Sequence, residues 1–149
     1  MEDFTGAYIH RKKDALALLT LNANHGIAIF HLGGVAIECR LKALLIMYHQ
    51  IQGWKQNSRR TGDSLYGLPI KNPSHKLMEA LKNMPTLYDK AMSDSVFLNH
   101  FSKIIHPLGS SSPDYITLRY SPKTELSTDN WQQSFNHVLG WLDQNQRSI

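Results

Sequence analysis

The longest regular pattern of apolar residues in the chain lies between residues 24 and 51. Its members alternate at steps of three and four positions, which is the spacing of one face of a helix. They are Ile27, Phe30, Gly34, Ile37, Leu41, Leu44, Tyr48 and Ile51. We therefore predict a long helix over 24–51 whose apolar stripe is buried, either against other helices of the chain or against a second copy.

Apolar residues at helical spacing also predict four shorter helices, at 10–21, 75–84, 86–105 and from 127–129 to beyond Leu142. Ser74 is the expected cap of the helix over 75–84, and the helix over 86–105 could break near Ser93. A few residues around 115–120 are the one candidate for a strand. Between the long helix and the next, residues 54–73 contain Gly, Pro, Asn, Ser and Arg, which predicts a long loop.

Together these elements predict an all-α fold. We expect a single up-and-down type helical bundle of about five helices over residues 1–149, with a long loop after the second helix. The length of 149 residues and the apolar content of 42% suit one compact core. Gly33 and Gly34 lower the helix propensity of the long helix, so we expect close approach of a neighbouring helix there.

Several features indicate a cytoplasmic protein that does not cross a membrane. Cys39 is the one cysteine, so no intrachain disulfide can form, and the N-terminal residues lack an apolar segment behind a basic start. Residues 15–37 carry no Asp, Glu, Lys or Arg, but asparagines and histidines in the middle of this stretch argue against a membrane span.

The net charge of +4 comes from the first half of the chain. Residues 1–82 hold eleven Lys and Arg against six acids, whereas residues 83–149 hold five against six. One basic group is residues 11–13 and the other is the loop over 55–76, which contains Arg59, Arg60 and Lys71. The two groups form a candidate nucleic-acid site, with Trp54 and Tyr66 available for stacking. The alternative is a solvated basic loop without a partner.

Three motifs, in this order, resemble the HEPN superfamily of helical domains. Residues 33–45, GGVAIECRLKALL, are similar to the small and apolar residues and the E-x-x-L-K-A-L core of the family's second helix. Residues 72–77, NPSHKL, resemble the H-x-L start of its third helix. Residues 118–120, LRY, are similar to an R-Y pair that often precedes its last helix.

The resemblance implies a cytoplasmic bundle that forms a homodimer and acts beside a nucleotidyltransferase or in toxin–antitoxin and defence systems. A nucleotide or RNA is the implied ligand. The regular stripe of the long helix then gives a candidate dimer face, made of Gly33, Gly34, Ile37, Leu41 and Leu44.

Many members of the superfamily are metal-independent ribonucleases, with an Arg followed after four to six residues by a His. The Arg would neutralise the scissile phosphate while the His moves protons for attack by the ribose 2′-hydroxyl. Here no Arg has a His at that distance. We therefore expect a non-catalytic binding or assembly module; the alternative is a ribonuclease with a noncanonical active site that uses Lys42, His49 or Arg119.

Each candidate site residue also has a structural interpretation. Glu38 and Lys42 have the spacing of an i,i+4 ion pair. Arg40, Lys42, His75 and Arg119 could bind phosphate, but Arg40 and Arg119 could equally form structural ion pairs, and His75 could anchor the loop. The histidines do not have the spacing of a metal site, so we predict no metal and no cofactor. Cys39 is expected to be a small buried residue.

Overall fold

The computed structural model describes residues 2–21, 25–51, 54, 61–62, 70–123 and 126–148, and this part of the chain is an all-α bundle, as the sequence predicts. Its α-helices are α1 (Phe4–Leu19), α2 (Gly26–His49), α3 (Leu77–Lys82), α4 (Pro85–Met92), α5 (Ser95–Ile105) and α6 (Asp129–Asn145). The described residues also include the 3₁₀ helices η2 (Thr117–Tyr120) and η3 (Gln146–Ser148), and β1 (Thr61–Gly62) pairs antiparallel with β2 (Ile70–Lys71).

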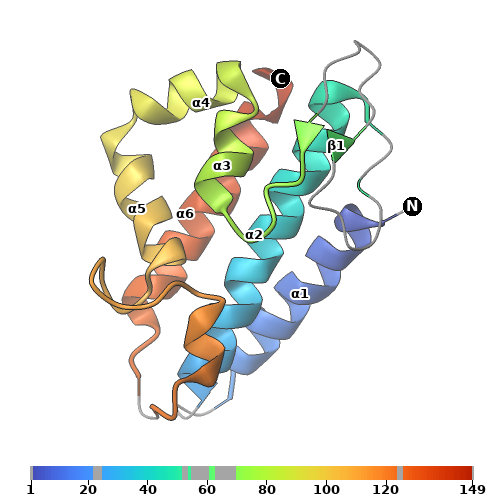
Figure 1. Ribbon diagram of the computed structural model, residues 1–149. Coiled ribbons are helices and arrows are strands. Elements are labelled where there is room, and N and C mark those ends of the chain that lie inside the picture. Colours follow the sequence, from blue (N-terminus) through green and yellow to red (C-terminus); the bar gives the residue numbers. More distant parts are fainter. Residues whose placement is uncertain are drawn as a thin grey trace.

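The helix α2 runs through the centre of the bundle (Figure 1). On one side α1 packs along its length, and on the other it contacts α3, α5, α6 and η2. The helix α6 packs mainly against α5, and α4 lies across one end of the bundle, between α3 and α5 (Figure 1). The longest predicted helix therefore provides the surface on which the other elements assemble.

The predicted helix over 86–105 is two helices, because Asp94 interrupts it. The Asp94 side chain accepts a hydrogen bond from the backbone N–H of Phe97 at 2.9 Å and so caps the start of α5. Trp141 of α6 donates its indole N–H to the other carboxylate oxygen at 3.1 Å. The break near Ser93 is thus confirmed. It raises the number of α-helices in the described residues from about five to six.

Two local predictions are wrong. Ser74 does not cap α3: it has a left-handed backbone, with φ of 57°, and its N–H donates to the side chain of Asn72, while Lys76 precedes the helix. Residues 115–120 form no strand, because the Asp114 carboxylate accepts from the N–H of Thr117 at 2.8 Å and turns the chain into η2.

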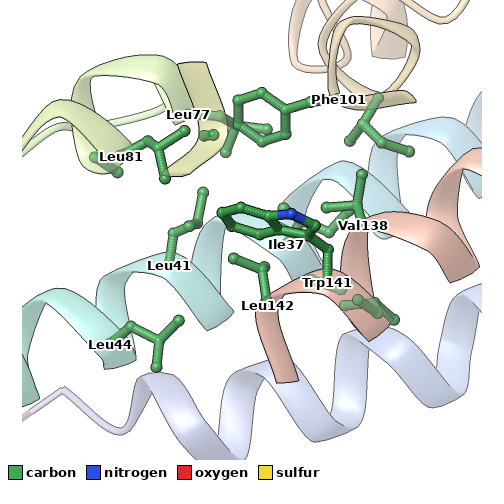
Figure 2. Close-up of a cluster of buried hydrophobic side chains, with 14 of the residues drawn as sticks. Ile37, Leu41, Leu44, Leu77, Leu81, Phe101, Val138, Trp141 and Leu142 are labelled. Atoms are coloured by element: carbon green, nitrogen blue, oxygen red, sulfur yellow. The ribbon is translucent and has the colours of Figure 1, made fainter. Parts of the chain in front are cut away.

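The apolar stripe of α2 is buried inside this chain, so the predicted dimer face is wrong. Ile37, Leu41 and Leu44 are at most 1% exposed. Figure 2 shows these three residues among side chains of other elements; those labelled there are Leu77 and Leu81 of α3, Phe101 of α5, and Val138, Trp141 and Leu142 of α6. Because the bundle itself covers this face, a second copy of the chain has no access to it.

Gly33 and Gly34 provide room for two aromatic rings. A Cβ atom on Gly33 would lie 2.3 Å from the ring of Trp131, and one on Gly34 would lie 2.3 Å from the ring of Tyr115. The expected close approach is therefore real, but aromatic side chains make it rather than the backbone of another helix. Both glycines are buried within the bundle.

Candidate functional site

The most concentrated polar site in the described residues surrounds the carboxylate of Glu38 on α2. Glu38 and Lys42 are only 7% and 6% exposed. The Lys42 ammonium donates to one carboxylate oxygen, Oε1, at 2.8 Å, which confirms the predicted i,i+4 ion pair. The same ammonium lies 5.5 Å from the ring centre of Phe4 on α1. Lys42 is thus enclosed between its partner carboxylate and an aromatic ring.

The second oxygen of Glu38, Oε2, has two partners from distant parts of the chain. The Tyr115 hydroxyl donates to it at 2.7 Å, and His75 Nδ1 lies 2.9 Å from it. A carboxylate oxygen only accepts, so this contact assigns the ring proton of His75 to Nδ1. The His75 side chain is nevertheless 55% exposed. His75 therefore anchors the segment before α3, which is one of the two roles predicted for it from the sequence.

Tyr115 has hydrogen-bond partners at both its backbone and its side-chain hydroxyl. Its backbone N–H donates to the carbonyl of Ile105 at 2.9 Å, and its carbonyl accepts from His31 Nδ1 of α2 at 3.2 Å. Its hydroxyl also lies 3.1 Å from the His75 carbonyl. Because the hydroxyl has one proton, the shorter contact to the Glu38 carboxylate is the principal hydrogen bond. Tyr115 thereby connects the end of α5 to the middle of α2.

Burial near the Glu38 charge changes two pKa values. The pKa of the Cys39 thiol rises from 9.0 to about 11, first because the thiol is desolvated and then because the negative charge of Glu38 is close. The pKa of the Tyr115 hydroxyl also rises well above its usual value, with the same two causes in the same order. Cys39 is therefore a neutral buried thiol at pH 7, as expected from the sequence.

Arg40 forms a structural ion pair on a different face of α2. Its guanidinium donates to Asp143 at 3.1 Å and to the Gln146 side chain at 2.6 Å, and it lies 5.7 Å from the ring centre of Tyr8. These contacts connect α2 to α1 and to the end of α6. The structural alternative for Arg40 is therefore the one that its partners support.

The candidate catalytic residues Lys42, His49 and Arg119 have separate partners. Lys42 is buried against Glu38, and His49 Nε2 lies 2.6 Å from the carbonyl oxygen of Asn83 after α3. Arg119 is exposed on η2, where its guanidinium donates to the adjacent Tyr120 hydroxyl at 2.8 Å and lies 4.8 Å from that ring centre. None of these contacts joins one candidate to another. A catalytic role for them remains a prediction.

The basic loop is only partly described. Arg59, Arg60 and Tyr66 lie outside the described residues. Trp54 is 4% exposed and donates its indole N–H to the Ile70 carbonyl at 2.9 Å, so the prediction that it stacks on a nucleic acid is wrong. Lys71, at the end of β2, is exposed. It lines a groove of about 500 Å³ together with Asn72, Pro73, Ser74, Lys76, Glu79 and Asn83.

No helix among the described residues is long and apolar enough to cross a membrane. Comparison with models of protein families, with curated proteins and with solved structures finds no match to this chain. The resemblance to the HEPN superfamily therefore rests on the three sequence motifs alone.

Sequence reasoning did not identify Tyr115 as part of the site. It lies three positions before the third motif, in a segment that was the candidate for a strand. The available signal was the pair of glycines in α2. Small residues beside a buried acid imply that a bulky partner approaches there, although nothing in the local sequence says which one.

Proposed function

We propose that this chain is a HEPN-like helical module that binds RNA phosphates at the groove between β2 and α3 and acts by binding rather than by cleavage. The observation that carries the proposal is the pair of exposed lysines in this groove, Lys71 and Lys76. Lysine ammonium groups in a groove are the common means of neutralising a phosphate backbone.

The charges around the groove support an anionic ligand. Glu79 is the acid among its described lining residues, and it lies 3.4 Å from the Lys82 ammonium, which offsets its charge. Lys71 and Lys76 therefore make the described lining of the groove positive at pH 7. The exposed ring of His75 lies next to Lys76 in the chain and adds a polar edge beside the groove.

The contacts of Glu38 support the HEPN-like part of the proposal. Glu38 belongs to the first motif and His75 to the second, and Tyr115 lies just before the third. Two of the segments that carry the resemblance thus meet at one carboxylate, together with a residue three positions before the third segment. A homodimer, and a nucleotidyltransferase or a toxin–antitoxin or defence partner, remain part of the proposal. A dimer would use a surface other than the buried stripe of α2.

Fluorescence anisotropy with a labelled single-stranded RNA tests RNA binding at this groove. We expect the affinity to fall steeply with salt. In the double variant Lys71→Ala, Lys76→Ala, the magnitude of the slope of log affinity against log salt should fall by about 1.4, about 0.7 for each phosphate contact of a single strand. The matched control is Lys90→Ala, Lys123→Ala, which removes the same charge from two exposed positions outside both basic groups. Equal losses in the two double variants would contradict a specific groove.

The same RNA, incubated with the protein in EDTA, tests the non-catalytic part of the proposal. We expect the RNA to remain intact. Cleavage by the wild-type chain that disappears in a folded His49→Asn variant would instead support the ribonuclease alternative, because this change removes the proton-transfer group.

A further inference from the structure

Two histidine rings meet where α5 packs against α6. His100 of α5 and His137 of α6 have ring centres 4.3 Å apart, with an angle of 31° between the ring planes. Both residues are partly buried. Figure 1 shows the two helices side by side, and α5 is the main packing partner of α6. This pair of titratable side chains therefore lies in the contact that holds α6 to the bundle.

Ser134, one turn before His137 on α6, fixes the position of the His100 ring. The serine is 0% exposed, and its hydroxyl oxygen lies 2.9 Å from His100 Nδ1. A buried hydroxyl has no water as an alternative partner, so this hydrogen bond keeps the ring against α6. The two histidine rings are thus held together and do not turn away from each other into solvent.

The environment of His137 suits a neutral ring. Its Nε2 atom is buried and has no hydrogen-bond partner among the described residues. In a neutral ring this nitrogen can be the one without a proton, whereas in a charged ring both nitrogens carry a proton. Protonation of His137 would therefore bury an N–H group without an acceptor, which costs more than an unpaired lone pair.

The groups around His100 also favour its neutral form. Desolvation is the first cause of a lowered pKa for His100, and the positive charges of His137 and Lys103 add to it. The carboxylate of Asp94, at the start of α5, interacts with His137. Helix α2, which packs on both helices, contributes buried apolar residues such as Ile37. A second positive charge in the pair would therefore have the repulsion of the first to overcome.

We propose that His100 and His137 form a pH-sensitive contact that fastens α6 to α5 at neutral pH and loosens on acidification. Above about pH 6.5, the ordinary histidine value, neutral rings pack without repulsion and the contact is complete. Below this pH the unfolded chain takes up protons that the folded pair excludes, so stability falls as the pH falls. The pair is separate from the lysine groove, and the proposal does not depend on RNA binding.

Urea denaturation of the full chain between pH 7.5 and 5 tests the proposal. We expect the unfolding constant of the wild type to rise as the pH falls below about 6.5. In His100→Gln, the slope of its logarithm against pH should be shallower by about 0.5–1, because up to one proton fewer is taken up on unfolding. The matched control His10→Gln, which removes an exposed histidine of α1, should keep the wild-type slope. Equal slopes in all three proteins would overturn the proposal.

Nuclear magnetic resonance of the wild-type chain tests the same contact without a variant. The ring signals of His100 should titrate at a lower pH than those of exposed His10. On acidification from pH 7.5 to 5.5, amide hydrogen exchange, corrected for its intrinsic pH dependence, should accelerate more in α5 and α6 than in α1. Titration of His100 together with His10, or equal acceleration in α1 and α6, would contradict the proposal.

Discussion

Glu38 and Arg40 are separated by one residue on α2 and both side chains are largely buried, yet Glu38 pairs with a buried lysine and Arg40 with an exposed aspartate. Glu38 is 7% exposed and contacts Lys42, His75 and Tyr115. Arg40 pairs with Asp143, whose side chain is 59% exposed. Residues two apart on a helix point about 200° apart, so one enters the bundle while the other faces α1 and the end of α6.

The contribution of an ion pair to the stability of this protein depends on how many buried groups rely on it. Removing one member of a buried pair leaves the other charge without water and without a partner. In the Arg40–Asp143 pair the Arg40 side chain is 16% exposed and the Asp143 side chain 59% exposed, and Arg40 has further partners, so removing the exposed carboxylate costs less. The Glu38 site should therefore dominate the response of this helix to mutation.

The largest effect is expected for Glu38→Ala. The change leaves the Lys42 ammonium buried and removes the acceptor of Tyr115 and His75, so the free energy of unfolding should fall by about 3–5 kcal/mol. Urea denaturation measures this loss. Glu79→Ala is the matched control, because Glu79 forms its ion pair with Lys82 at the surface, where the two side chains are 52% and 47% exposed.

The double variant Glu38→Leu, Lys42→Met sharpens the same comparison. It removes both charges, so no unpaired ion is buried, and it should be more stable than Glu38→Ala alone. Tyr115 would retain the His75 carbonyl, 3.1 Å away, as an acceptor. If the double variant were as unstable as Glu38→Ala, the loss of stability would come from the missing carboxylate and not from a buried Lys42 charge without a partner.

Tyr115→Phe is expected to have the next largest effect. The ring still fills the space beside Gly34, but the Glu38 carboxylate loses a hydrogen bond of 2.7 Å, so the free energy of unfolding should fall by about 1–3 kcal/mol. Tyr120→Phe is the control, because that hydroxyl is bonded to exposed Arg119. Similar losses in both variants would remove the distinction between the buried and exposed sites.

Alkaline pH should lower the free energy of unfolding through the titratable groups around Glu38. The pKa of Cys39 in the folded chain, about 11, is above its ordinary value of 9.0. The neutral buried thiol therefore contributes fully to the free energy of unfolding below pH 9, and this contribution is lost as the pH rises through 11. At pH 10 this loss amounts to about 1 kcal/mol of unfolding free energy. The raised pKa of Tyr115 acts in the same direction.

Urea denaturation at pH 7, 9 and 10 measures this dependence. Cys39→Ala should be less sensitive to the same change in pH, since it has no thiol to ionise. Identical pH profiles for the wild type and Cys39→Ala would contradict a raised thiol pKa.

The smallest effect is expected for Asp143→Ala. Arg40 keeps its hydrogen bond to Gln146 and its contact with Tyr8, so the free energy of unfolding should change by at most about 1 kcal/mol. The change should shrink further in high salt, where exposed charges are screened. A loss comparable to that of Glu38→Ala would mean that the two faces of α2 do not differ as described.

Periodicity in the sequence was sufficient to predict α2, the fold class and the Glu38–Lys42 pair, because each depends on residues three or four positions apart. Periodicity could not predict the other partners of Glu38, because His75 and Tyr115 are 37 and 77 positions away in the chain. The groove beside α3 and the histidine pair between α5 and α6 combine segments in the same way. The predicted dimer face was wrong because an apolar stripe on one helix does not specify which other helix packs against it.

The sequence by itself therefore determined that this chain forms helices, where most of them lie and which faces are apolar. These properties follow from local spacing and from the need to remove apolar side chains from water. The contacts between distant segments added that Gly33 and Gly34 accept aromatic rings, that Glu38 is buried and that Arg40, 16% exposed, pairs with the exposed carboxylate of Asp143. The physical reason is that the environment of a charge depends on packing between segments far apart in the chain, which local periodicity does not encode.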